Sequence, residues 1–194
     1  MASAFSHIAI PAALFACCKS SRVNTKLFVL AAACSVIPDI DVIAFYFGIP
    51  YQSQWGHRGF THSAVFAMVL AALLTGFHRR LCSKRWTVFW FCFLSCVSHA
   101  LLDAMTNGGL GVALYWPFSL ERLFFSFRPI QVSPIGVGRF FTSKGMYVIA
   151  SELIWVLLPA LITGILGALV RRKYTAKRQS GKTDNNMGCC TGVA

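Results

Sequence analysis

Several histidines and aspartates of this sequence lie within or beside apolar segments. His99 and Asp103 are four residues apart in an apolar run, so a helix would place both on one face. An imidazole and a carboxylate in such a setting are costly unless they are paired, hydrated or bound to a metal. The pair therefore predicts either a functional site or a hydrogen bond that merely ties helices together.

The other acids and imidazoles favour a site. The chain has six Asp and Glu residues and five His. Asp39 and Asp41 come near the end of one apolar run, His57 and His62 lie close together, and His7 opens the first apolar segment. A chain that avoids carboxylates almost everywhere and then places several beside histidines is more consistent with a site than with an ordinary polar surface.

These residue types are ligands of divalent metals. Histidine nitrogens and carboxylate oxygens without cysteine thiolates suit zinc best, with manganese or iron as alternatives. Such an ion lowers the pKa of its water towards about 7 and so supplies a nucleophile at neutral pH. Asp41 and Asp103 are candidates for a general base, or for orienting a ligand histidine. The candidate metal ligands are His7, Asp39, Asp41, His57, His62, His99 and Asp103.

Three arginines are the candidate substrate-binding residues. Arg58 follows His57 directly, and Arg122 and Arg128 lie in an aromatic loop. A guanidinium group binds phosphate through two parallel hydrogen bonds, so the combination predicts hydrolysis of a phosphoester in a lipid or lipid-linked substrate. Arg58 joins Asp41 and Asp103 as a candidate catalytic residue. The alternative for Arg122 and Arg128 is that they only reach towards lipid headgroups.

The composition predicts that membrane helices position these residues. Of the 194 residues, 56% are hydrophobic, which favours a membrane protein over a water-soluble globule. The net charge is +12, but the basic residues cluster at the ends of apolar runs, which favours contact with anionic lipid over nucleic acid. The eight cysteines include no Cys-x-x-Cys pair, so neither a zinc knuckle nor a redox motif is predicted.

The apolar pattern predicts an all-α integral membrane bundle of about five segments. The first is shorter than a full span of about 20 residues. Pro38 should break the second segment beside Asp39 and Asp41, which places both on irregular backbone that lines a cavity. Residues 112–144 should form a long outer loop, rich in aromatic residues, at the membrane interface. The predicted segments are 3–18, 27–47, 60–77, 86–105 and 146–170.

The basic residues predict the orientation. Residues 1–170 should form one membrane-embedded, hydrolase-like domain, and residues 171–194 a basic, disordered tail. Residues 19–26, residues 79–85 and the tail hold 13 of the 18 Lys and Arg residues, so the positive-inside rule places them in the cytoplasm. The N-terminus and all seven candidate ligands then fall on the outer face.

The spaced motifs resemble those of the YdjM-like family of membrane-bound, metal-dependent hydrolases, found in bacterial inner membranes and linked to the DNA-damage regulon. The resemblance covers about residues 5–135 and implies a multi-helix protein with a phospholipase-like hydrolase activity. The spacing of His99 and Asp103 is more distantly similar to that of zinc-dependent phospholipases C and nucleases. The matching residues are His7, Pro38-Asp39-Ile40-Asp41, His57-Arg58-Gly59-Phe60-Thr61-His62-Ser63, His99-Ala100-Leu101-Leu102-Asp103, Thr106 and Trp116-Pro117-Phe118-Ser119.

Two other functions use the same residues. A non-enzymatic membrane protein could bind a structural metal or conduct ions or protons through a chain of His and Asp. Such a path needs polar groups across the membrane, whereas segments 60–77 and 146–170 are apolar apart from Ser, Thr and Glu152. A purely structural scaffold would leave the stretch 57–62 without a reason. The expected partners are membrane lipids and the substrate, with no nucleic acid and no protein partner.

Overall fold

Helices make up the regular structure of the protein. The computed structural model describes residues 2–133 and 143–187, and within these ranges it contains two isolated β-bridges and no strand. This confirms the predicted all-α class. The α-helices are α1 (Ala4–Cys18), α2 (Thr25–Cys34), α3 (Ala64–Leu74), α4 (Arg85–Ala104), α5 (Ser143–Glu152) and α6 (Leu158–Met187), and 3-10 helices follow or precede them at η1 (Ile37–Phe47), η2 (Phe60–His62) and η3 (Thr75–Phe77).

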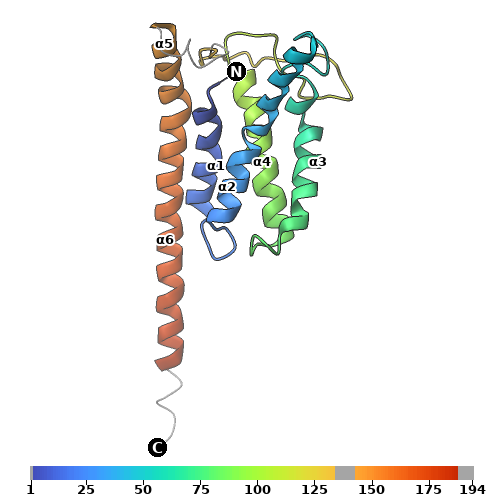
Figure 1. The fold of residues 1–194 in the computed structure, drawn as a ribbon. Coiled ribbons are helices and arrows are strands. Elements are labelled where there is room, and N and C mark those ends of the chain that lie inside the picture. The colour runs from blue at the N-terminus through green and yellow to red at the C-terminus, as the bar shows by residue number, and fades with distance from the viewer. Residues whose placement is uncertain (1, 134–142, 188–194) are drawn as a thin grey trace, which may run out of the picture.

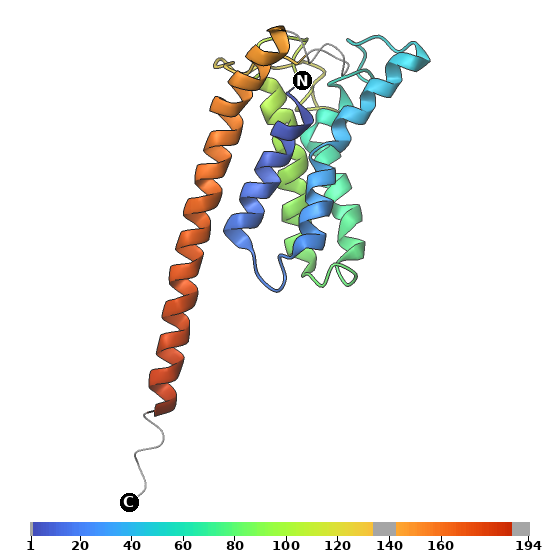
Figure 2. The same cartoon turned by 60° about the vertical axis from the view of Figure 1, so that its left-hand side comes forward.

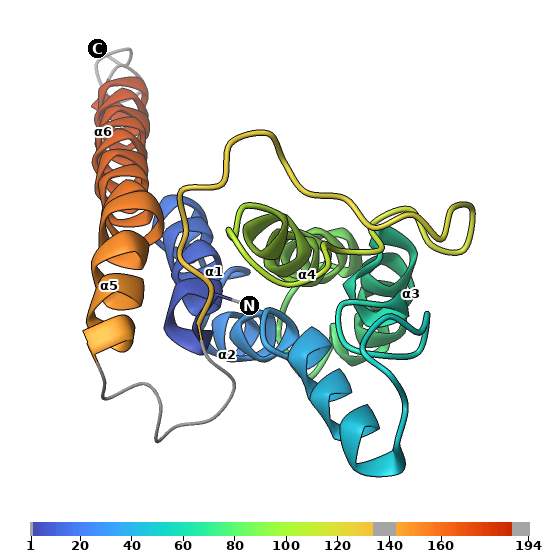
Figure 3. The ribbon, with the colours of Figure 1, turned by 90° about the horizontal axis from the view of Figure 1, so that it is seen from above.

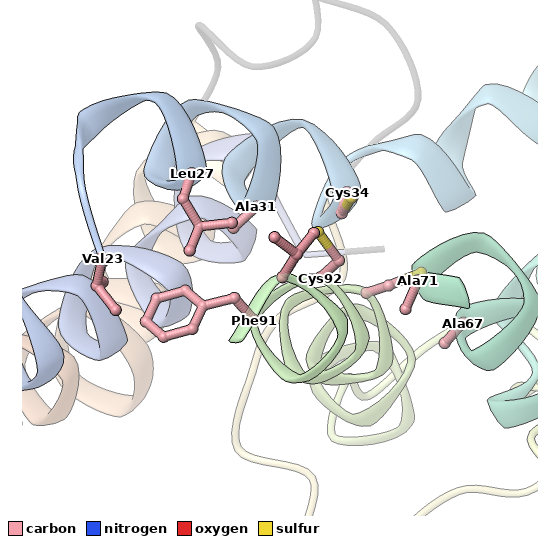
Figure 4. Close-up of a cluster of buried hydrophobic side chains, with 10 residues drawn as sticks. Val23, Leu27, Ala31, Cys34, Ala67, Ala71, Phe91 and Cys92 are labelled. Atoms are coloured by element: carbon pink, nitrogen blue, oxygen red, sulfur yellow. The ribbon is translucent and has the colours of Figure 1, made fainter. Parts of the chain in front are cut away.

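Helix α4 lies at the centre of a bundle that α1, α2 and α3 complete, while α5 and α6 lie beside α1 (Figures 1 and 3). The apolar core below the upper end of the bundle joins α2, α3 and α4. Leu27 and Ala31 of α2 face Phe91 and Cys92 of α4 there, with Ala71 of α3 on the other side (Figure 4). Burial of these side chains holds the helices at fixed distances from one another. It therefore also fixes the positions of the side chains at the helix ends.

The apolar helices agree with the predicted membrane segments. Three stretches are long and apolar enough to cross a bilayer, namely Thr25–Phe47, Arg85–Ala104 and Gly145–Ala176. Two shorter apolar helices, Ala4–Cys18 and Ala64–Phe77, correspond to the first and third predicted segments. The five-segment prediction is therefore confirmed, including the short first segment.

The second segment breaks where proline predicts it. Helix α2 ends at Cys34, and η1 begins at Ile37 with Pro38 in its first turn. Proline has no N–H to continue an α-helix, and it is tolerated in a first turn. As a result Asp39 and Asp41 lie on a tighter 3-10 helix and are both buried.

The end of the chain differs from the prediction. Helix α6 continues to Met187, so the stretch after residue 170 is helical that far rather than disordered. A run with strong helix formers such as Arg, Lys and Ala can extend a helix that the membrane segment has already nucleated. Residues 188–194 and 134–142, which belong to the predicted tail and loop, lie outside the described residues.

The predicted outer loop lies over one end of the bundle. The described chain has no helix from Thr106 to Ser133. Its regular structure there consists of two isolated β-bridges, which pair Thr106 with Ile130 and Val112 with Leu123. It crosses the end at which α1 begins and α4 ends, opposite the α1–α2 and α3–α4 connections (Figure 1). The loop therefore covers the end of the bundle that carries the candidate ligands.

Candidate metal centre

Seven candidate ligands from five parts of the chain meet at the covered end of the bundle. Helix α1 supplies His7, η1 supplies Asp39 and Asp41, the turn 57–59 and η2 supply His57 and His62, and α4 supplies His99 and Asp103. The two candidate ligands on α4, His99 and Asp103, lie near the end of that helix, whose last residue is Ala104. The predicted convergence of these side chains on one end is confirmed.

Four side-chain atoms form a closed group. His62 Nε2 lies 3.1 Å from His99 Nε2, 3.6 Å from Asp103 Oδ2 and 3.8 Å from Asp39 Oδ1. His99 Nε2 lies 3.3 Å from Asp39 Oδ1. Ligand atoms about 2.1 Å from a tetrahedral zinc ion would be about 3.4 Å from one another. The group therefore has the dimensions and the donor types of a tetrahedral His₂Asp₂ site.

The other ring nitrogens show which way the two imidazoles are oriented. Nδ1 of His99 donates to the carbonyl oxygen of Ser35 at 2.8 Å. Nδ1 of His62 lies 3.2 Å from Asp41 Oδ2, which accepts its proton. Each neutral ring then presents a lone pair at Nε2, and these lone pairs face each other. That arrangement is stable only if a cation, either a metal ion or a proton, lies between the rings and the carboxylates.

The carboxylate oxygens of the group are also short of partners. Asp39 Oδ1 and Asp103 Oδ2 are buried atoms without a hydrogen bond. Buried unpaired acceptors are rare in proteins, because each costs its full desolvation free energy. A divalent cation would satisfy both oxygens and both ring nitrogens at once, so the residues present fit such an ion.

A proton can partly replace that cation. His62 lies outside the membrane-spanning segments. Burial by itself lowers the pKa of the His62 ring, but the hydrogen bonds and charges of Asp103 and Asp41 outweigh it and raise this pKa to about 9. Without a metal the ring is therefore protonated at neutral pH, and metal binding must displace that proton.

Asp41 orients its neighbours instead of joining the four-atom group. Its Oδ2 accepts hydrogen bonds from the Arg58 backbone N–H at 3.0 Å and from Thr61 Oγ1 at 2.7 Å. Its Oδ1 lies 2.6 Å from Nδ1 of His57. Together with the contact to His62, this engages both carboxylate oxygens. Asp41, His57 and His62 also form a second group with ligand spacing.

Arg58 is fully buried, and its guanidinium group contacts other side chains and the backbone of the protein. Its Nε lies 2.8 Å from Asp103 Oδ2 as an ion pair, although the angle does not make a hydrogen bond. Its two NH groups donate to Thr106 Oγ1 and to the carbonyl oxygen of Gly108, each at 3.0 Å. The backbone φ of Arg58 is 62°, a left-handed conformation that is rare outside glycine. The structure thus surrounds this guanidinium group with protein acceptors.

The other two arginines differ from each other. Arg122 donates to the backbone carbonyls of Tyr51, Ser53 and His57, at 2.9 to 3.0 Å, and so fastens the loop to the connection before η2. Arg128 is exposed and stacks over the ring of Phe124 at 4.8 Å. Of the three candidate substrate-binding arginines, Arg128 is exposed, Arg122 is half-buried and Arg58 is buried.

His7 lies next to the four-atom group and is not part of it. Its ring stacks on that of His99 with 3.7 Å between centroids, and its Nε2 is 3.8 Å from Asp103 Oδ1. Both ring nitrogens are buried without a hydrogen bond. Asp103 Oδ1 instead accepts the backbone N–H of Ala2 at 2.8 Å.

Three residues of the site were not predicted from the sequence. The Ser35 carbonyl fixes His99, Thr61 holds Asp41, and Glu152 of α5 binds Ser3 beside the group. Glu152 carried a usable signal, since it is a carboxylate inside an apolar segment, as Asp103 is. A backbone carbonyl such as that of Ser35 carries no such signal, because every residue has one.

Comparison with known proteins agrees with the sequence motifs. Residues 1–175 match the family described as YdjM inner membrane protein. The chain is also 38% identical to the inner membrane protein YbcI of Escherichia coli (strain K12) over 174 residues, which cover 89% of this chain and 99% of YbcI. No solved structure matches. Together with its apolar helices, these matches identify an integral protein of the inner membrane.

Proposed function

We propose that this chain, which belongs to the YdjM inner membrane protein family, is a membrane-bound, metal-dependent hydrolase. The observation that carries the proposal is the group of four facing atoms, His62 Nε2, His99 Nε2, Asp39 Oδ1 and Asp103 Oδ2. They are buried, they have the spacing of metal ligands, and two of them, Asp39 Oδ1 and Asp103 Oδ2, accept no hydrogen bond.

Each side chain has a distinct role in the proposed centre. His62, His99, Asp39 and Asp103 would hold the ion, with zinc as the preferred metal and manganese or iron as alternatives. With water as a fifth ligand beside these four side chains, such an ion would supply a nucleophile at neutral pH. Asp41 keeps Nδ1 of His62 protonated, so that Nε2 faces the ion.

Arg58 acts on the ligands in this proposal. Its guanidinium group neutralises part of the charge of Asp103, and its backbone N–H holds Asp41. Arg58 therefore links Asp103, which would bind the metal, to Asp41, which orients His62. This differs from direct phosphate binding, because its donors already point at protein atoms.

The surroundings support a lipid or lipid-linked phosphoester as the substrate. The centre lies at one end of membrane-spanning helices, under a loop with exposed Tyr115, Phe118 and Leu120. Apolar and aromatic side chains of this kind sit at the level of lipid headgroups. Arg128 lies in the same loop with its guanidinium group accessible, and we assign phosphate recognition to it.

The charge distribution supports a centre on the outer side of the inner membrane. The α1–α2 and α3–α4 connections, together with the first residues of α2 and α4, carry seven Lys and Arg residues at the end of the bundle opposite the centre (Figure 1). By the positive-inside rule these connections are cytoplasmic. The substrate would then be reached from the outer leaflet.

The interior disfavours the transport alternative. Between the centre and the opposite end, the buried core of the described bundle is mainly apolar, with residues such as Leu27, Ala71 and Val88, and Ser95 is a buried polar side chain of α4. A proton or ion path would need polar groups along that distance. A hydrolase needs them at one end, which is where they lie.

Metal content and hydrolysis test the proposal together. The protein would be purified in detergent, loaded with Zn²⁺ or Mn²⁺, dialysed and measured by elemental analysis, and then assayed for phosphate release from phosphatidic acid in mixed micelles. We expect close to one bound ion per chain, and loss of both ion and hydrolysis in His62→Ala and His99→Ala.

His78→Ala is the matched control. His78 lies at the opposite end of the bundle and its Nδ1 contacts only the carbonyl oxygen of Thr75. This variant should keep the ion and the activity. A wild-type protein that retains no metal after loading would exclude the proposed function. Retained metal without hydrolysis of any phosphoester would leave a structural metal site.

A further inference from the structure

Glu152 is a buried carboxylate inside the last membrane-spanning stretch. It lies in Gly145–Ala176 and its residue is 3% exposed. A carboxylate at such a position is costly unless it is paired, so it indicates a function or a specific contact. Glu152 is also the last residue of α5, directly before a π-helical turn at Leu153–Leu157. Such turns often occur at functional sites.

Its partner is the beginning of α1. Both carboxylate oxygens bind Ser3, with the backbone N–H donating to Oε1 and the hydroxyl group donating to Oε2. Ser3 is the N-cap of α1, and its own side chain makes no cap hydrogen bond. The carboxylate therefore satisfies a free N–H at the positive end of the helix dipole.

The preceding residue contacts the metal centre. The backbone N–H of Ala2 donates to Asp103 Oδ1 at 2.8 Å, and Ala2 is fully buried. Two consecutive backbone N–H groups thus bind two buried carboxylates from different helices, Glu152 and Asp103. Because Oδ1 of Asp103 accepts this hydrogen bond, Oδ2 is the oxygen turned towards His62.

The same contact fixes the position of α1. Helix α6 packs mainly against α1, and the π-helical turn that joins α5 to α6 also contacts α1 (Figures 2 and 3). Ser3 is one helical turn from His7, whose ring stacks on that of His99. A shift of the first turn of α1 would therefore move both the Ala2 amide and the His7 ring that stacks on His99.

We propose that Glu152 is a positioning residue for the metal centre. By holding Ser3 it keeps the Ala2 amide on Asp103 Oδ1, which presents Oδ2 to the ion, and it keeps His7 against His99. The inference rests on the proposed metal site. Partners that orient a ligand in this way typically change metal affinity by about 10- to 100-fold when they are removed.

Zinc affinity of the full-length, detergent-purified protein tests this role. It would be measured by competition with a chromogenic chelator for wild type, Glu152→Ala, Glu152→Gln and Ser3→Ala. We expect about 10- to 100-fold weaker binding for Glu152→Ala and a smaller loss for Ser3→Ala. Glu152→Gln should bind almost as wild type, because its amide oxygen still accepts the Ser3 N–H and its NH₂ group can donate to the hydroxyl oxygen.

A second measurement separates positioning from packing. The visible absorption of the Co²⁺-loaded protein reports the geometry around the ion, and it should change in Glu152→Ala. A residue that only packs helices would lower the unfolding temperature of the metal-free protein and leave the Co²⁺ spectrum unchanged. The control is Glu121→Ala, which removes an exposed loop carboxylate and should change neither readout.

Three outcomes have distinct meanings. Wild-type zinc affinity and an unchanged Co²⁺ spectrum in Glu152→Ala would overturn this inference and leave the metal site standing. Absence of metal binding in the wild type would overturn both. If Glu152→Ala does not fold, Ser3→Ala decides alone, since unaltered affinity in that variant would equally overturn the inference.

Discussion

The Nε2 atoms of His62 and His99 face each other at 3.1 Å, on rings whose Nδ1 atoms are both engaged elsewhere. Two lone pairs at this distance repel, and two carboxylate oxygens beside them have no hydrogen bond. The protein therefore concentrates negative potential at a buried point. A cation would be stable at that point, and the surrounding side chains are donor types that a divalent metal accepts.

Zinc should stabilise the folded protein. An ion that binds the native state alone contributes about 2.7 kcal/mol at 100 times its dissociation constant, and a chelator should remove this gain. Thermal unfolding in detergent with and without Zn²⁺ measures it. His78→Ala should respond as wild type, whereas His99→Ala should show no Zn²⁺-dependent shift. A shift that persists in His99→Ala would place the bound ion elsewhere.

Asn variants should separate a ligand from an orienting carboxylate. Asp41→Asn leaves the four-atom group intact and weakens the hold on His62, so we expect zinc affinity to fall by about 10- to 100-fold. Asp39→Asn removes a charged ligand and should cost more than about 100-fold. Competition titration gives both constants. Equal losses would mean that Asp41 also binds the metal directly.

Arg58 and Arg128 should behave in opposite ways. Arg58→Met leaves the Asp103 carboxylate buried without its counter-charge, which typically costs about 3–5 kcal/mol of folding free energy. Arg128→Met removes an exposed guanidinium group and should leave stability and zinc content unchanged.

In the phospholipid assay, Arg128→Met should raise KM for a substrate that carries phosphate. Urea titration measures the folding free energy of both variants, and steady-state kinetics measures their KM. If Arg128→Met altered metal content instead of KM, the assignment of phosphate recognition would be wrong.

Glycine substitutions should show how tightly the connection before η2 is built. A Cβ at Gly59 would lie 2.1 Å from the carbonyl oxygen of Gln54, so Gly59→Ala must displace the backbone that carries His57 and His62. We expect reduced zinc affinity and a lower unfolding temperature. Gly76→Ala meets no atom within 4 Å and lies in a helical turn, so it should be neutral or stabilise by up to about 1 kcal/mol.

Much of the centre could be predicted because intramembrane polar residues are so costly. Asp39, His62, His99 and Asp103 stand out in apolar surroundings, and the break at Pro38 follows from the missing N–H of proline. The positive-inside rule independently grouped the same side chains at one end of the bundle. Composition and local pattern sufficed for these features.

The division of roles could not be predicted in this way. Asp39 and Asp41 are indistinguishable in the sequence, and only the fold shows that Asp39 faces His62 and His99 while Asp41 accepts hydrogen bonds from Arg58 and Thr61. The sequence also does not show that the Arg58 guanidinium group points inward, where it pairs with Asp103. Such assignments depend on contacts between distant segments.

The contact between Ser3 and Glu152 joins residues that are 149 positions apart. Ser3 leaves the ribosome well before Glu152, so the contact cannot form until the stretch Gly145–Ala176 has entered the membrane. Until then, the Ala2 amide and Asp103 have no fixed geometry. If the proposed metal site is correct, metal loading is accordingly a late event in biogenesis, and a chain whose last segment failed to insert should bind the ion more weakly.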